Sequence, residues 1–260
     1  MEAGPLSTAR ISGAVRPSPV FLGIVALAAA GGVLAWRSDT TSNAARAGVF
    51  VLVVAGWIVS LCLHEFAHAY TAWRAGDHEV EVRGYLTLNP LRYSHPVLSI
   101  ALPIAFIALG GFGLPGGAVY VRPGLFGPAM QRRISLAGPA VNVVLAIALL
   151  AAIRILADGT HAAFWFGLSF LAFLQITAAV LNLLPIPGLD GYGAIEPSLS
   201  PKTRRALDQY KPLGLLAVLA LLWVPSINAA FFDAVYWLFE LSGVPADWSR
   251  FGSYLTQFWR

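Results

Sequence analysis

The chain has 260 residues, of which 57% are hydrophobic and only 12% are charged, and its formal net charge is +4. Soluble domains carry about 25% charged residues, so this composition excludes an ordinary soluble domain and predicts a polytopic membrane protein. The basic residues cluster in loops and do not form the continuous basic stripe of a nucleic-acid-binding protein. Cys62 is the only cysteine, so no disulfide can form within the chain.

Apolar segments long enough to cross a bilayer follow one another, since about 20 apolar residues span its core. Membrane-spanning helices are expected at 19–36, 48–74, 134–157 and 162–184. Residues 213–243 form either two short helices or one kinked helix, and we favour a helical hairpin. Residues 97–114 are also apolar but are broken by proline and glycine, so we expect a re-entrant or hairpin insertion there. These segments predict an all-α polytopic membrane protein with about six transmembrane helices.

Two polar stretches are expected at the membrane surface. Apolar and polar residues alternate from His78 to Leu88, which is typical of short strands and predicts a membrane-associated β element. The tail at 246–260 mixes aromatic and polar residues, which is typical of an amphipathic segment at a membrane interface.

His64, Glu65 and His68 form a His-Glu-x-x-His pattern inside the second apolar segment. Residues four apart share one face of a helix, so both imidazoles point the same way and can bind one metal ion. An ionisable side chain at the centre of a membrane helix costs roughly 2.5–3.5 kcal/mol on insertion scales, so three together need a partner. The pattern therefore predicts a single bound Zn²⁺.

Catalytic zinc usually takes three protein ligands, so a third must come from elsewhere in the chain. Asp190 follows an apolar segment and stands in a turn rich in proline and glycine, which can direct its carboxylate inward. An ordinary turn residue before Gly191 is the alternative for Asp190. Glu196 is the second candidate ligand, and spacing alone leaves the choice open.

The His64–His68 motif, together with Asn-Leu-Leu-Pro-Ile-Pro-Gly-Leu-Asp-Gly at 182–191, resembles the site-2 proteases, which are intramembrane zinc metalloproteases. Residues 137–142 resemble the Gly-Pro-x-x-Asn helix start of that family, and residues 84–90 resemble its strand-and-turn element. The resemblance covers roughly residues 48–200. It is to the small bacterial type, without a PDZ or C-terminal regulatory domain.

This resemblance implies a set of site residues. It implies that the zinc ligands are His64, His68 and Asp190. Glu65 is then the general base for water and the proton donor to the leaving amine, and Asn182 stabilises the developing oxyanion. The alternative for Asn182 is a helix C-terminal cap.

The function predicted is a zinc-dependent intramembrane endopeptidase that hydrolyses peptide bonds in or near transmembrane segments of membrane-anchored proteins. Its parts would be an N-terminal segment with the first helix at 1–47, a catalytic core at 48–200, and a C-terminal hairpin and tail at 201–260. The alternative is a non-catalytic membrane metal-binding or carrier module. A carrier needs ligands but no base beside them, so Glu65 favours the protease.

Basic residues indicate the orientation in the membrane. Ten of the 17 Lys and Arg residues fall on the side where the histidine pair and Asp190 are expected to meet. Cytoplasmic loops carry an excess of Lys and Arg, so this side is predicted to be cytoplasmic. We therefore expect a multi-pass plasma-membrane protein whose active site opens toward the cytoplasm. Its expected partners are the lipid bilayer and a membrane-protein substrate of the single-span or signal-anchor type.

Overall fold

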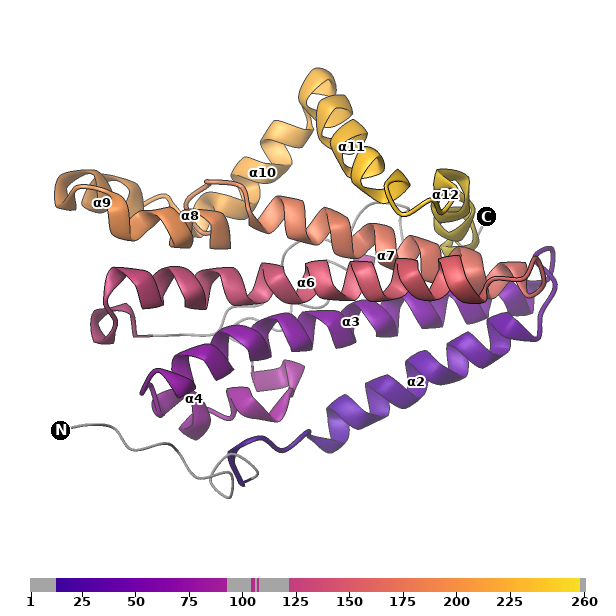
Figure 1. The fold of residues 1–260 in the computed structure, drawn as a ribbon, viewed down its shortest axis with the longest axis horizontal. Helices are drawn as coiled ribbons and strands as arrows, with labels where there is room; N and C mark the ends of the chain where they lie inside the picture. The colour runs from indigo at the N-terminus through magenta and orange to yellow at the C-terminus, as the bar shows by residue number, and fades with distance from the viewer. Residues whose placement is uncertain (1–12, 93–103, 106, 108–121, 258–260) are drawn as a thin grey trace.

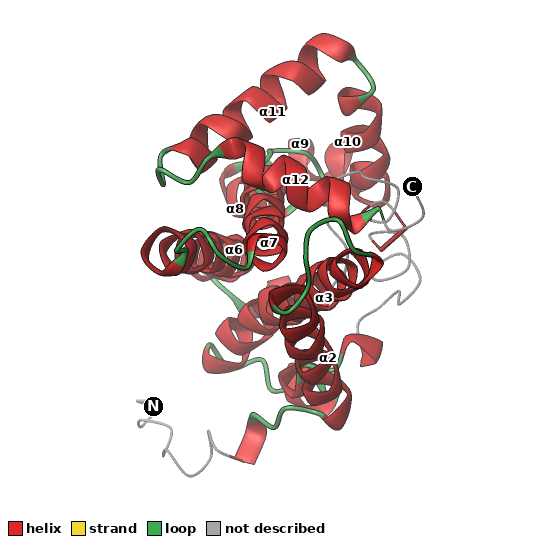
Figure 2. Cartoon of the chain, turned by 90° about the vertical axis from the view of Figure 1, so that its right-hand side faces the viewer, coloured by secondary structure: helices red, strands yellow, loops and turns green. Residues whose placement is uncertain are grey.

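The computed structural model describes residues 13–92, 104, 105, 107 and 122–257, and within these ranges all regular structure is helical (Figures 1 and 2). Four helices are long and apolar enough to cross a membrane: α2 (Pro19–Trp36), α3 (Asn43–Arg74), α6 (Pro128–Leu156) and α7 (Ala162–Asn182). Over these ranges the chain is thus an all-α membrane protein. All four spans end within two residues of the predicted last residue, whereas the second and third begin five and six residues earlier than predicted.

Helix α7 is the centre of the bundle. Every residue from 169 to 179 is buried, and α7 packs against both α3 and α6. In Figure 1, α3, α6 and α7 run side by side along the long axis of the molecule. Because α3 and α6 both lie against α7, polar side chains that face inward from these three helices meet in the interior of the bundle.

Helix α2 packs closely against α3 through small residues. A Cβ added at Gly48 would lie 2.6 Å from the backbone nitrogen of Ala35, and one added at Gly31 would lie 2.5 Å from that of Leu52. Helices associate in lipid largely through such close backbone packing, because lipid tails are as apolar as leucine. Ser42 begins α3 by accepting a hydrogen bond from the backbone N–H of Ala45.

The C-terminal part consists of five shorter helices: α8 (Asp190–Ile195), α9 (Pro201–Asp208), α10 (Gly214–Leu222), α11 (Pro225–Glu240) and α12 (Ala246–Thr256). The segment containing α10 and the helix α11 are bent by 96° relative to each other, so the region of the predicted hairpin holds two helices that meet at nearly a right angle. Neither is long enough to cross a bilayer alone. Over the described ranges there are four spans, or five if the bent pair counts as one, so six are not confirmed.

The β element predicted at 78–88 is wrong. These residues form α4 (Glu79–Val82) and a 3₁₀ turn at Tyr85–Thr87, and a second 3₁₀ turn follows at Pro90–Arg92. Local contacts favour the helix: Asp77 accepts from the backbone N–H of Glu79, and Glu79 pairs with Arg83 one turn later. The insertion predicted at 97–114 lies almost entirely outside the described residues.

Asp77 joins the turn after α3 to the segment before α6. Its side chain is 1% exposed and accepts hydrogen bonds from the backbone and guanidinium N–H groups of Arg122. Burial raises the pKa of Asp77, but the hydrogen bonds from Arg122 outweigh it and hold the pKa below its ordinary value. A depressed pKa in the folded state means that this stabilisation is present at neutral pH and is lost as the pH falls below the ordinary range of Asp.

We expect Asp77→Asn to lower the free energy of unfolding by about 1–2 kcal/mol at pH 7, because charged hydrogen bonds are lost. The partial exposure of Arg122 keeps the loss from being larger. Thermal unfolding in detergent should show this difference shrinking below about pH 4, as wild-type Asp77 becomes protonated. Asp247→Asn is the control, because its ion pair with Arg250 is exposed and contributes little. Equal stability of the Asp77 variant and wild type at pH 7 contradicts the role of this pair.

Candidate metal centre

His64, His68 and Asp190 converge on one point inside the bundle. Their possible ligand atoms all lie within 4.8 Å of one another. Nε2 of His64 is 3.1 Å from Nε2 of His68 and 3.2 Å from Oδ2 of Asp190, and Nε2 of His68 is 3.4 Å from Oδ1 of Asp190. The carboxylate that stands more than a hundred residues later in the sequence therefore faces both imidazoles directly.

These separations fit a tetrahedral zinc ion. Nitrogen and oxygen ligands bind zinc at about 2.0–2.2 Å, which places two tetrahedral ligand atoms about 3.3–3.5 Å apart. The observed 3.1–3.4 Å agrees with that spacing. Two imidazoles and one carboxylate also form a donor set typical of catalytic zinc, which leaves a fourth position open.

Gly138 of α6 keeps the space beside the imidazoles open. A Cβ added there would lie 2.5 Å from Nε2 of His64 and closer still to Nε2 of His68. Any larger side chain would thus occupy the position that an ion between these nitrogens requires. The glycine within the Gly-Pro-x-x-Asn stretch is explained by this close approach.

The turn between α7 and α8 brings Asp190 back to the histidines. Pro185 and Pro187 cannot continue a regular helix, and Gly188 has a φ of +97°, which favours glycine. A Cβ at Gly191 would collide with the backbone carbonyl of Leu183. The chain therefore doubles back tightly after α7, and Asp190 begins α8 at the metal centre.

A backbone carbonyl orients the ring of His68. Nδ1 of His68 lies 2.6 Å from the carbonyl oxygen of Ile134 in α6. A carbonyl oxygen only accepts hydrogen bonds, so Nδ1 carries a proton, and in the neutral imidazole Nε2 then presents a lone pair to the centre. This is the tautomer that a metal ligand needs. Nδ1 of His64 lies 2.6 Å from Oδ1 of Asn142.

The other two predicted site residues, Glu65 and Asn182, are also buried. Glu65 is 4% exposed and follows His64 on α3. Asn182 is 8% exposed and is the last residue of α7, immediately before the turn that leads to Asp190.

The structure distinguishes between the two candidates for the third ligand. Glu196 accepts a hydrogen bond of 2.8 Å from Lys211 and lies near Arg204, and it is not part of the group formed with the histidines. Asp190 is therefore the candidate ligand, and Glu196 belongs to a surface ion-pair network.

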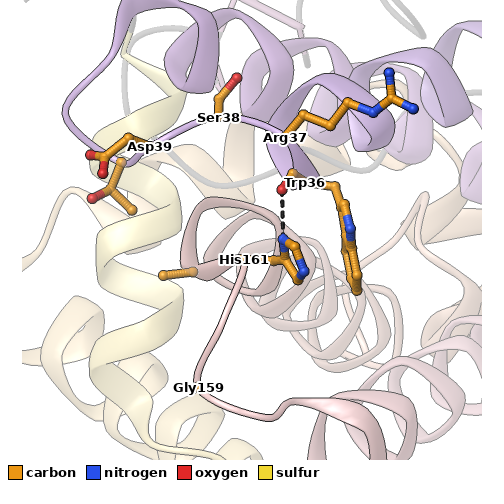
Figure 3. A pocket seen from close by; sticks show the side chains of 8 residues that line it. Trp36, Arg37, Ser38, Asp39, Gly159 and His161 are labelled. Carbon is orange, nitrogen blue, oxygen red and sulfur yellow. Dashed lines mark hydrogen bonds between the residues drawn. The ribbon is translucent and has the colours of Figure 1, made fainter.

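A polar pocket at the opposite end of the bundle does not repeat this arrangement. Figure 3 shows His161 donating a 2.7 Å hydrogen bond from Nδ1 to the carbonyl of Trp36, against whose indole its ring stacks. His161 precedes α7 and Asn182 ends it, which separates them by about 30 Å at 1.5 Å per residue. Among the described residues, only His64, His68 and Asp190 form a cluster of three possible metal ligands.

Known proteins that are similar over nearly the whole chain carry zinc-metalloprotease names. The chain is 60% identical to "Putative zinc metalloprotease Rip2" of Mycobacterium tuberculosis, over 94% of this chain and 95% of that protein. It is 58% identical to the Rip2 protein of Mycolicibacterium smegmatis over the same shares of both chains. The chain belongs to the site-2 protease family.

A more distant relative also carries a zinc-metalloprotease name. "Putative zinc metalloprotease YwhC" of Bacillus subtilis is 35% identical over 65% of this chain and 78% of that protein. No family model matches the chain, and no solved structure matches it. The family is thus shown by whole-length relatives, and the candidate metal centre rests on the geometry of His64, His68 and Asp190.

Of the residues that support the ligands, Asn142 belongs to the Gly-Pro-x-x-Asn stretch seen in the sequence, whereas Ile134 and Gln175 belong to no motif. The carbonyl of Ile134 has no side-chain signature. Gln175 of α7, which hydrogen-bonds Asn142, stands inside an otherwise apolar span. A signal for it was present, because an uncharged polar residue inside a membrane helix needs a partner.

Proposed function

We propose that the chain is a zinc-dependent intramembrane endopeptidase that hydrolyses peptide bonds in or near transmembrane segments of membrane-anchored proteins. The observation that carries this proposal is the convergence of His64, His68 and Asp190 at tetrahedral spacing inside a bundle of membrane helices. The zinc-metalloprotease names of the whole-length relatives support the same reaction class.

Each polar residue at the proposed centre has a distinct task. His64, His68 and Asp190 hold the ion, which when bound supplies Lewis-acid activation of water and of the substrate carbonyl. Glu65 takes the proton from the attacking water and returns it to the leaving amine. The amide of Asn182 donates a hydrogen bond to the carbonyl oxygen as negative charge develops on it.

Burial of the centre favours a substrate that reaches it through the membrane. His64 and His68 are 6% and 8% exposed, and they stand within the apolar helix α3. A peptide bond within a helix is shielded by that helix, so we propose that the substrate segment unwinds locally before cleavage. Basic residues are concentrated on the side of the membrane where the histidines and Asp190 meet, which supports a centre that opens toward the cytoplasm.

We expect Glu65→Gln to reduce hydrolysis by roughly 10²- to 10⁴-fold, because a general base is lost while the ligands stay in place. Purified protein in liposomes is incubated with a panel of single-span membrane proteins, and the cleaved fragments are quantified. The zinc content of the variant serves as the control and should equal that of wild type. A carrier would move or hold zinc and cleave nothing, and equal cleavage by both proteins removes Glu65 from the mechanism.

A further inference from the structure

Three uncharged polar residues from three membrane helices form a continuous hydrogen-bond chain that ends on His64. Ser60 of α3, Asn142 of α6 and Gln175 of α7 are 4%, 3% and 0% exposed. We propose that Asn142, Gln175 and Ser60 act as a one-way relay that fixes the His64 tautomer and keeps its Nε2 lone pair directed at the metal. The inference rests on the proposed zinc site and does not depend on proteolysis.

The direction of the relay is set at its far end. The hydroxyl of Ser60 lies 2.8 Å from the backbone carbonyl of Trp57, and a carbonyl can only accept. The proton of the Ser60 hydroxyl is therefore committed to Trp57, and its oxygen is left to accept. Nε2 of Gln175 lies 2.9 Å from that oxygen and supplies the hydrogen.

Each later bond follows from the one before it. Because its amide nitrogen faces Ser60, Gln175 presents Oε1 to Asn142, whose Nδ2 donates to it across 2.8 Å. Asn142 must then present Oδ1 to Nδ1 of His64, 2.6 Å away. An amide oxygen only accepts, so Nδ1 carries a proton, and in the neutral imidazole that binds a metal Nε2 then carries none.

The reverse arrangement is less favourable. Turning both amides round would place an NH₂ group of Asn142 against Nδ1 of His64 and would force the proton onto Nε2, where it excludes a metal ion. Ser60 would then have to donate to Gln175 and give up its bond to Trp57. Partly satisfied polar networks are costly inside a bundle, so the arrangement with every bond made is favoured.

The relay explains why the two histidines reach the same tautomer by different means. His68 has a backbone carbonyl, that of Ile134, beside its Nδ1. The partner of His64 is instead a side chain, that of Asn142, and an asparagine amide by itself can turn either its oxygen or its nitrogen to an imidazole. Gln175 and Ser60 are the positioning residues that remove this ambiguity, and they act on His64 through Asn142.

The test measures zinc affinity by chelator competition on the purified full-length protein in detergent. Gln175→Leu should weaken zinc binding roughly 10- to 100-fold, the usual effect of removing a partner behind a metal ligand. Thr177→Val is the matched control, because Thr177 is also fully buried on α7 but bonds only the carbonyl of Phe173 in its own helix. Its zinc affinity should equal that of wild type.

A second pair of variants tests the direction of the relay. Ser60→Ala should weaken zinc binding by about 2- to 5-fold, the value of one hydrogen bond, and Ser60→Thr should restore it because the hydroxyl returns. This pair decides the matter if Gln175→Leu does not fold. Wild-type affinity in folded Gln175→Leu, or equal affinity of Ser60→Ala and wild type, overturns the relay. A wild-type protein that binds zinc without cleaving substrate contradicts the proposed function alone.

Discussion

Gly138→Ala is expected to abolish zinc binding and, with it, hydrolysis. The added methyl group would lie 2.5 Å from Nε2 of His64 and closer to Nε2 of His68, where the ion has to sit. The imidazoles would have to turn away, and His64 and His68 would then lose their hydrogen bonds to Asn142 and to the carbonyl of Ile134. We expect a larger loss of affinity than the roughly 10- to 100-fold that follows removal of an outer-shell partner. Zinc titration of the purified variant measures it.

The control for this variant is Gly23→Ala in α2, where an added Cβ meets no atom within 4 Å. Alanine favours a helix over glycine by about 1 kcal/mol, so neither change should weaken its helix. Zinc loss confined to the Gly138 variant would locate the ion against α6. A zinc affinity equal to wild type in that variant would place the metal elsewhere.

Asp190→Asn should likewise lower zinc affinity by more than removal of an outer-shell partner does, because one of three proposed ligands becomes a weak neutral donor. Chelator competition at pH 7 measures the change. The same exchange at Glu196, Glu196→Gln, is the matched control, since that carboxylate pairs with Lys211 and should leave zinc affinity unchanged. The opposite result, zinc loss only in the Glu196 variant, would exchange the two carboxylates in the site.

Hydropathy predicted the membrane-spanning helices well but not their full lengths. Residues 19–36 were predicted to the residue, because Ser18 and a proline begin that helix where the apolar run begins. Helix α6 starts at Pro128, six residues before the predicted span. Gln131, Arg132 and Arg133 continue the helix into polar surroundings. Apolarity thus marks the part of a helix that lies in lipid, whereas hydrogen bonding and capping decide where the helix ends.

The residues of the proposed site were predictable to the extent that their spacing is local. His64 and His68 are one turn apart, so their common face follows from helix geometry alone. The choice of Asp190 over Glu196 needed either the family resemblance or the structure, because a tight turn decides which carboxylate returns. Gln175 required knowledge of which helix faces meet. The strand prediction at 78–88 failed because alternation over a few residues is weaker than the contacts of Asp77 and Glu79.

X-ray absorption at the zinc edge, on the purified wild-type protein, tests the central claim most directly. The arrangement of His64, His68 and Asp190 predicts one zinc ion per chain with only nitrogen and oxygen neighbours at about 2.0–2.2 Å, two of them imidazoles. Cys62 is buried two residues before His64 and would add a sulfur neighbour at about 2.3 Å if it were a ligand. A sulfur neighbour, fewer than two imidazoles, or a protein that retains no zinc would contradict the proposed centre.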